Sequence, residues 1–146
     1  MTLVHFFVLM AMGALAPDRD HSDLADAITT VVESERPLFA SDEDHLRTAS
    51  LMVAIAFRES SFRNDAVGDH GRSVCAFQIH GGSHELLEDP VACVKVAFRM
   101  LRESVHIDRE NPVAFYCRGP RYQSDEARRL SRDRMRLARR LLGEVR

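Results

Sequence analysis

The sequence lacks the features that mark disordered, fibrous and repetitive proteins. No stretch is dominated by glycine or proline, and no repeat or low-complexity segment interrupts the 146 residues. With 45% hydrophobic and 29% charged residues, the composition is that of an ordinary folded protein. A chain of this length buries roughly two thirds of the surface that it exposes when unfolded. One hydrophobic core, and hence one domain, is therefore expected.

The closely spaced ligand pairs of common metal sites are also missing. Cys75, Cys93 and Cys117 are far apart, whereas zinc fingers and ribbons use close cysteine pairs. His80 and His84 have the spacing of helical ligands, but the two glycines between them argue against one helix that holds both. We expect no metal site and no cofactor. Three cysteines allow at most one intramolecular disulfide, which we expect to join Cys75 to Cys93 if the chain is exported.

The N-terminal apolar run is too short to span a bilayer comfortably. Residues 2–16 are almost entirely apolar and end in small residues that suit a signal peptidase. No lysine or arginine precedes the run, and Pro17 would directly follow a cut after Ala16. The alternative is a buried first helix. We expect residues 1–16 to be a signal peptide of a periplasmic or secreted protein that meets a membrane only through this segment.

Charge is distributed unevenly along the chain, although the net charge is only −2. Residues 1–50 carry nine acidic and three basic side chains, whereas residues 118–146 carry ten arginines and four acidic side chains. An arginine-rich helix could bind nucleic acid through its phosphates. The apolar stripe in the same segment instead predicts an ordinary amphipathic helix with a solvated basic face. We therefore expect no nucleic-acid partner; in an exported protein this face would meet anionic wall polymers.

Helical patterns dominate residues 20–146, which we expect to form a single domain. The predicted helix starts are Ser22, Ser41 with Asp44 as a capping box, Asp89 with Pro90, Asn111 with Pro112, and Ser124. Between residues 63 and 84, four glycines punctuate a stretch with a short β-like piece at 74–79. The sequence thus predicts a mainly α domain of four or five helices around a glycine-rich loop or small β-hairpin.

Glu59 is the first candidate for a chemical role. It follows the almost continuously apolar run at 51–57 and precedes the glycine-containing loop, so its carboxyl group is expected at the edge of the core. Burial disfavours the charged form and raises the pKa, which keeps a glutamic acid protonated near neutral pH. The alternative is a structural carboxylate, bonded to backbone amides or paired with Arg58 or Arg63.

Three blocks around this residue resemble the signature of the soluble lytic transglycosylases and goose-type lysozymes. They are ESSF at 59–62, CAFQI at 75–79 within GDHGRSVCAFQIH, and AFYCRG at 114–119, so the resemblance covers about residues 40–142. It implies a lysozyme-like fold with the active-site cleft beside the loop. It also implies cleavage of the bond between N-acetylmuramic acid and N-acetylglucosamine in peptidoglycan glycan strands, without a cofactor.

Carried onto this chain, the resemblance assigns Glu59 as the general acid and base. The substrate-binding residues that it implies are Ser61, Phe77, Gln78, His80 and Tyr116. Tyr116 is also expected to orient the Glu59 carboxyl group. The chain departs from the family pattern at Gly68, Cys75 and Cys117, where serine, glycine and asparagine are typical. A non-catalytic glycan-binding domain of the same fold is therefore an alternative.

Asp69 bears on which reaction is expected. It matches the position where goose-type lysozymes have an acidic residue thought to activate water, and an inverting hydrolase needs such a second carboxylate. A lytic transglycosylase instead uses one glutamate as acid and then as base, and leaves a 1,6-anhydro sugar. Because Asp69 could equally stabilise a turn, we predict a lytic transglycosylase, with a hydrolytic muramidase as the alternative.

Overall fold

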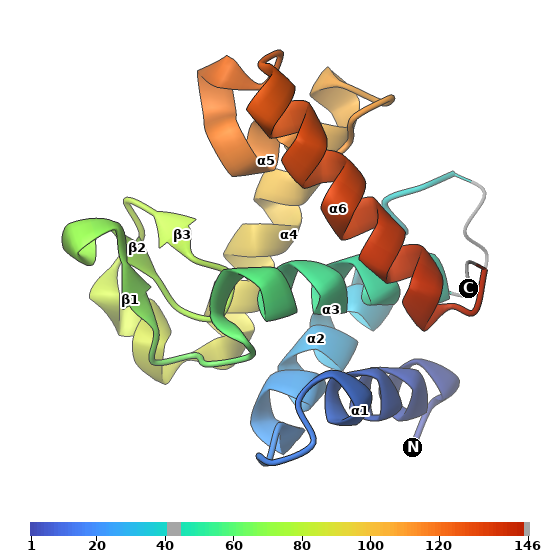
Figure 1. Cartoon of the computed structure of the whole chain (residues 1–146). Helices are drawn as coiled ribbons and strands as arrows, with labels where there is room; N and C mark the ends of the chain where they lie inside the picture. The colour runs from blue at the N-terminus through green and yellow to red at the C-terminus, as the bar shows by residue number, and fades with distance from the viewer. Residues whose placement is uncertain (41–44, 145–146) are drawn as a thin grey trace.

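The computed structural model describes residues 1–40 and 45–144. These residues form six α-helices, three short 3₁₀ helices and one three-stranded antiparallel sheet, which confirms the prediction of a mainly α chain (Figure 1). The α-helices are α1 (Leu3–Leu15), α2 (Ser22–Ser34), α3 (Leu46–Ser60), α4 (Pro90–Ile107), α5 (Ala114–Arg118) and α6 (Asp125–Leu141). The 3₁₀ helices are η1 (Asp69–Gly71), η2 (His84–Glu88) and η3 (Gly119–Arg121). Ser41 and Asp44, the predicted capping box, lie outside the described residues.

Helix α3 runs through the middle of the molecule and contacts α1, α2 and α6 (Figure 1). Residues 48–56 are all buried, because a helix surrounded by other helices is apolar on all sides. Helix α2 packs against α4, and α5 lies between α4 and α6. The last turn of α3 leaves this core on the side of the small sheet, so residue 59 lies where the core meets the surface.

The N-terminal run forms a helix that belongs to the same core. Val4, Val8, Ala11 and Met12 of α1 are buried, and the helix contacts α2 and α3. The structure thus describes these residues as the buried first helix that was the alternative to a signal peptide. Across the described part of the chain, no helix has both the length and the apolar character needed to cross a membrane. Cleavage of residues 1–16 stays a prediction.

The glycine-punctuated stretch folds into strands β1 (Val67–Gly68), β2 (Ser73–Val74) and β3 (Ile79–His80). Strand β2 pairs with both neighbours, with Val74 opposite Val67 in β1 and opposite Ile79 in β3. The expected hairpin is therefore present, but the β-like piece at 74–79 is not one strand. Cys75 and Gln78 have left-handed backbones, with φ of 67° and 49°, and reverse the chain between β2 and β3.

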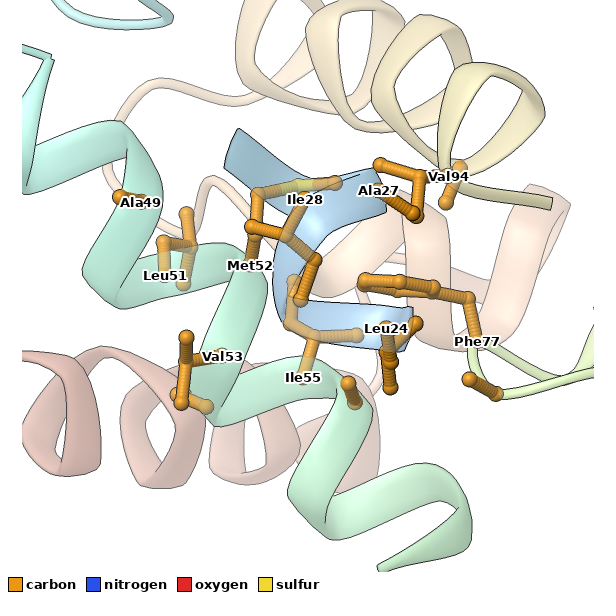
Figure 2. Packing of buried hydrophobic residues seen from close by; sticks show 14 of the residues in the cluster. Leu24, Ala27, Ile28, Ala49, Leu51, Met52, Val53, Ile55, Phe77 and Val94 are labelled. Carbon is orange, nitrogen blue, oxygen red and sulfur yellow. The ribbon is translucent and has the colours of Figure 1, made fainter. Parts of the chain in front are cut away.

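The turn between β2 and β3 is anchored in the core in two ways. A disulfide joins Cys75 to Cys93 of α4, which is the expected pairing, and both residues are fully buried. Figure 2 shows the Phe77 ring among the buried side chains of α2, α3 and α4, and Phe77 is 0% exposed. The sheet is thereby fixed at one end of α3.

Two of the predicted helix caps are confirmed. The Asp89 carboxylate accepts a hydrogen bond from the Ala92 amide at the start of α4, at 3.0 Å. The Ser124 hydroxyl accepts one from the Ala127 amide at the start of α6, at 3.1 Å. These two caps fix the ends of the helices that form one side of the cavity described below.

The predicted cap of α2 and the predicted start of α5 are wrong. Ser22 is the first residue of α2 rather than its cap, and the Asp20 carboxylate accepts the Ser22 amide at 2.9 Å. Helix α5 begins at Ala114, after the Asn111 carbonyl has accepted the Ala114 amide in a turn at 3.0 Å. A local turn precedes each helix, so Ser22 does not cap α2, and α5 begins only after Asn111 and Pro112.

Candidate active site

A cavity of about 830 Å³ is lined by residues of α3, the β-sheet region, α4, α5, η3 and α6. Five of the predicted site residues line it: Glu59, Asp69, Gln78, His80 and Tyr116. Segments that are far apart in the sequence therefore meet here, as the three blocks predict. Whether these side chains bind a glycan stays a prediction.

Glu59 projects from the last turn of α3, and its side chain is 22% exposed. The helix ends directly after it because Ser61 has a left-handed backbone, with φ of 53°. Burial raises the pKa of the Glu59 carboxyl, and the negative charge of Asp69 raises it further, while the positive charges of Arg134 and Arg118 oppose this. The net direction is upward, as expected for a general acid.

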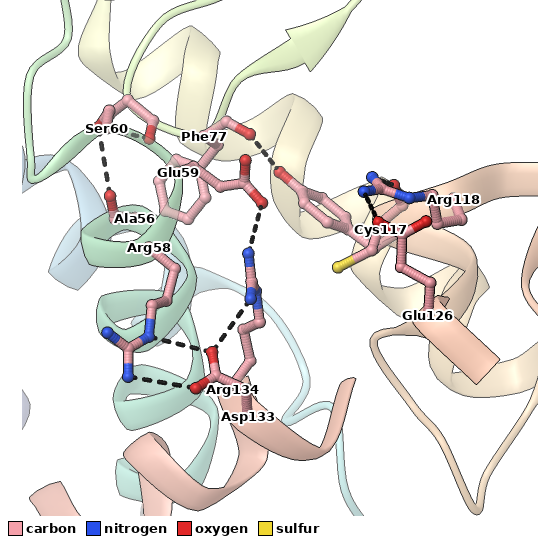
Figure 3. A network of polar contacts seen from close by, with 12 residues as sticks. Ala56, Arg58, Glu59, Ser60, Phe77, Cys117, Arg118, Glu126, Asp133 and Arg134 are labelled. Carbon is pink, nitrogen blue, oxygen red and sulfur yellow. Dashed lines mark hydrogen bonds and ion pairs between the residues drawn. The ribbon is translucent and has the colours of Figure 1, made fainter. Parts of the chain in front are cut away.

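Arg134 of α6 is the ion-pair partner of Glu59, and neither Arg58 nor Arg63 is. One Arg134 Nη atom lies 3.6 Å from a Glu59 carboxylate oxygen (Figure 3), which is an ionic contact beyond hydrogen-bond distance. The Arg134 side chain is only 12% exposed and lines the cavity. The prediction that the arginines of this helix form a solvated face is therefore wrong for Arg134.

The ion pair belongs to a longer row of charges that Figure 3 shows joining α3 to α6. Arg58 contacts both carboxylate oxygens of Asp133, at 3.0 and 3.2 Å. The other Nη atom of Arg134 donates to Asp133 at 3.0 Å. Arg134 is thus shared between two carboxylates, and the Asp133 contact is the shorter one.

Asp69 is the first residue of η1, between β1 and β2, and it lines the cavity. Its side chain accepts a hydrogen bond of 2.5 Å from the Ser73 hydroxyl, and the residue is exposed. Its backbone is left-handed, with φ of 51°. Asp69 therefore stabilises its own turn, as the alternative interpretation expects, while it also contributes negative charge to the cavity.

Gln78 is held by the loop that it belongs to. Its amide nitrogen donates to the carbonyl oxygens of Ala66 and Cys75, at 3.1 and 3.0 Å. Its amide oxygen lies against Gly68, so a side chain at position 68 would clash with it. The Gln78 amide would therefore have to shift to admit a side chain at position 68. These contacts give Gln78 a loop-stabilising role, and its role in substrate binding stays a prediction.

His80 is exposed at the rim of the cavity. Its Nδ1 lies 3.5 Å from the Ser73 hydroxyl, which also donates to Asp69. His80 and Asp69 are therefore linked through one serine, on the sheet side of the cavity.

Phe77 and Ser61 do not line the cavity. The Phe77 ring is fully buried in the core, so it has no face to offer a sugar, and the prediction for its side chain is wrong. Ser61 is exposed, and its carbonyl oxygen accepts a hydrogen bond from Arg19 outside the cavity.

Tyr116 lies next to Glu59 but is bonded elsewhere. Its hydroxyl donates to the Phe77 carbonyl oxygen at 2.7 Å, so the expected orientation of Glu59 by this hydroxyl is wrong. Burial raises the pKa of Tyr116 well above its ordinary value, and the nearby Glu59 charge adds to this. Tyr116 therefore stays neutral and ties α5 to the turn between β2 and β3.

Cys117 places a thiol on the cavity wall. It is the one cysteine outside the disulfide. Burial raises its pKa to about 11, against the opposing positive charge of Arg134. Because the thiolate is the nucleophilic form, this shift disfavours nucleophilic attack by Cys117 near neutral pH.

Ser104 of α4 positions the segment that carries Tyr116. Its fully buried hydroxyl donates to the Pro112 carbonyl at 2.7 Å and accepts from the Tyr116 amide at 2.9 Å. One hydroxyl thus satisfies two buried backbone groups. Sequence reasoning missed it, because a serine on the buried face of a helix gives no indication of its distant partners.

Replacing Ser104 by alanine is expected to reduce the free energy of unfolding by about 1–3 kcal/mol, because two buried backbone groups would lose their partner. Urea unfolding followed by circular dichroism measures the loss. Ser34→Ala is the matched control, since the Ser34 hydroxyl contacts only the Val31 carbonyl of its own helix. Equal losses in the two variants would contradict the bridging role of Ser104.

Comparison with family models, with curated proteins and with solved structures gave no match. Within the described residues, no group of three or more histidine, cysteine and acidic side chains could hold a metal ion. The family resemblance of the three blocks therefore stays a prediction.

Proposed function

We propose that the chain is a peptidoglycan-cleaving enzyme, a lytic transglycosylase that acts between N-acetylmuramic acid and N-acetylglucosamine. The observation that carries the proposal is the Glu59 carboxyl group: it lines a cavity of about 830 Å³ and its pKa is raised by burial. A cavity of this volume is in the range typical of ligand sites, roughly 300–1,000 Å³. The three sequence blocks resembling this family supply the substrate class, and we propose a lysozyme-like fold on the same basis.

In the proposed reaction, protonated Glu59 donates its proton to the glycosidic oxygen as the bond to the anomeric carbon breaks. The N-acetyl group of the substrate assists at the anomeric carbon. The Glu59 carboxylate then removes a proton from the sugar 6-hydroxyl, whose oxygen closes onto the anomeric carbon to give the 1,6-anhydro end. One carboxyl group suffices for both steps, and no water is consumed.

We favour this reaction over hydrolysis because the contacts of Asp69 are those of a residue that stabilises its own turn. One Asp69 carboxylate oxygen accepts a hydrogen bond of 2.5 Å from Ser73 within a left-handed turn, which favours a structural role for this side chain. The hydrolytic muramidase remains the second candidate, because Asp69 and Glu59 line the same cavity.

Mass spectrometry of the soluble fragments tests the proposed reaction. Purified protein is incubated with peptidoglycan, and the released muropeptides are analysed. Anhydro ends are expected, and they are lighter than reducing ends by one water molecule. Fragments with only reducing ends would show hydrolysis instead and would overturn the transglycosylase assignment.

Replacing Asp69 by asparagine is expected to lower the rate of muropeptide release by less than about tenfold, because the proposed reaction needs no second carboxylate. Loss of a water-activating base would cost a hydrolase about 10²-fold or more. The control is Asp65→Asn, an exposed aspartate of the same loop that does not line the cavity. A hundredfold loss in Asp69→Asn alone would favour the muramidase.

We also propose that the protein is exported. The disulfide between Cys75 and Cys93 supports this, since disulfides persist in oxidising compartments. The partners would then be glycan strands at the cavity and anionic wall polymers at the exposed arginines of α6. Mass spectrometry of the mature N-terminus in an expressing cell would detect removal of residues 1–16, and an intact cytoplasmic chain would contradict export.

A further inference from the structure

Helix α6 divides its arginines between two opposite faces. At about 100° per residue, the exposed ones fall within an arc of about 120°. They are Arg128, Arg129, Arg132, Arg136, Arg139 and Arg140. Arg134 is on the other side, in the middle of the stripe that holds Ala127, Leu130 and Leu137 against the rest of the protein. A single cation is therefore directed into the molecule, toward the cavity that holds Glu59.

The burial of Arg134 is not explained by its own hydrogen bonds. Its Nε atom is buried and has no hydrogen-bond partner among the described residues, and an unsatisfied buried donor costs free energy. Its Glu59 contact, at 3.6 Å, is longer than a hydrogen bond. An apolar residue at position 134 would fit the same stripe and would bury no unpartnered donor. The arginine is thus better explained by what it does to Glu59 than by stability.

Asp133 is the closer of the two carboxylates that contact the Arg134 guanidinium. Its contact with Arg134, at 3.0 Å, is shorter than the Glu59 contact. Asp133 is in turn held by the two-point contact from Arg58 on α3. A free arginine beside a carboxylate would form a close fork with both oxygens. Here Arg134 contacts two carboxylates, and its contact with Asp133 is shorter than its contact with Glu59.

We infer that Arg134 is a positioning residue for Glu59, and that Asp133, held by Arg58, restrains its guanidinium at a distance that leaves Glu59 able to carry a proton. The inference deepens the proposed function and rests on it in assigning Glu59 as the acid. A fully paired Glu59 would stay ionised and could not protonate a glycosidic oxygen. A Glu59 with no cation nearby would hold its proton too strongly to give it up and then act as the base.

The other groups that face Glu59 set the direction of each expected change. Arg118 of α5 adds positive charge, Asp69 of η1 adds negative charge, and the Tyr116 hydroxyl and the Cys117 thiol are neutral near neutral pH. Removing the Arg134 charge therefore raises the pKa of Glu59. Removing the Asp133 charge releases Arg134 toward Glu59 and lowers that pKa. The two neighbouring substitutions are expected to act in opposite directions.

Carbon-13 NMR titration of the Glu59 carboxyl group tests this, with its signal assigned by its absence in Glu59→Gln. We expect Arg134→Met to raise the titration midpoint by about one pH unit and Asp133→Asn to lower it, since an opposite charge at this range shifts a carboxyl by about one to three pH units. Arg134→Lys, which keeps the charge, is expected to restore most of the difference. Arg58→Met, an exposed change that leaves Asp133 only Arg134 as partner, is expected to raise the midpoint slightly.

Arg47 and Glu144 provide matched controls, because they form a second arginine–carboxylate pair that joins α3 to the segment after α6, with atoms 2.7 Å apart. Arg47→Met and Glu144→Gln are expected to leave the Glu59 midpoint unchanged. Midpoints that move in the same direction in Arg134→Met and Asp133→Asn, or that match the controls, would overturn the inference. If Arg134→Met does not fold, Arg58→Met and Asp133→Asn still decide it by their opposite signs.

The titration separates this inference from the proposed function. If the protein releases muropeptides, the alkaline limb of the pH–rate profile should move with the Glu59 midpoint, upward in Arg134→Met and downward in Asp133→Asn. If no peptidoglycan is cleaved, the proposed function fails while the NMR midpoints still report the coupling. Midpoints that move as expected with an unmoved alkaline limb would show that Glu59 is not the acid and would overturn the positioning role.

Discussion

Replacing Glu59 by glutamine is expected to lower the rate of muropeptide release by about 10²- to 10⁴-fold, the contribution typical of a general acid or base. Glutamine has nearly the same shape and still fits the half-buried site at the end of α3. It carries no acidic proton to donate and cannot accept one from the sugar hydroxyl. Both steps of the proposed reaction would therefore lose their proton carrier. Muropeptide release from purified peptidoglycan, followed by chromatography, measures the effect.

The control for this substitution is Glu103→Gln, which makes the same chemical change on the wall of the same cavity, from α4. We expect it to retain most of the activity, because Glu103 is exposed and makes no contact with Glu59. Release that persists unchanged in Glu59→Gln would show that Glu59 is not the acid. A wild-type protein that binds glycan strands without releasing fragments would favour the non-catalytic domain.

Local sequence patterns predicted the helices well where burial and capping act together. The apolar run that forms the middle of α3 predicts a helix buried on every side, and Asp89 and Ser124 predict the starts of α4 and α6. The conformation of the turn between β2 and β3 could not be predicted from local patterns. Cys75 and Gln78 adopt left-handed backbones there because the disulfide, the buried Phe77 ring and the Gln78 hydrogen bonds hold the turn. These are tertiary constraints.

Some features of the candidate site could be predicted from the sequence, and others could not. The raised pKa of Glu59 follows from its position at the end of an apolar helix, which the sequence makes visible. The burial of the Phe77 ring could not be predicted, because the direction of a side chain in a tight turn depends on the backbone angles of that turn. Arg134 did have a signal, because it lies three residues before Leu137 and four after Leu130, on the apolar stripe of α6. An arginine at the centre of such a stripe indicates a buried partner of opposite charge.

Removing the disulfide between Cys75 and Cys93 is expected to reduce the free energy of unfolding by about 3 kcal/mol, the entropic contribution of a cross-link of this length. The bond spans 18 residues and joins the turn between β2 and β3 to α4. That turn carries Gln78 and the Phe77 carbonyl that Tyr116 contacts. Loosening it should therefore lower the rate of muropeptide release as well as stability. Urea unfolding of the Cys75→Ala/Cys93→Ala variant and of wild type measures the first effect.

Cys117→Ala serves as the control, because it removes a thiol that forms no cross-link. It also prevents exchange between Cys117 and the disulfide during unfolding, so comparing oxidised and reduced protein in this variant isolates the bond itself. The oxidised chain with Cys117 present is expected to show one reactive thiol after denaturation, and the reduced chain three. An unfolding midpoint that is the same with and without reduction would mean that packing alone holds the turn against α4. The loss of activity on reduction would then be absent too, since the same contacts position Gln78 and Tyr116.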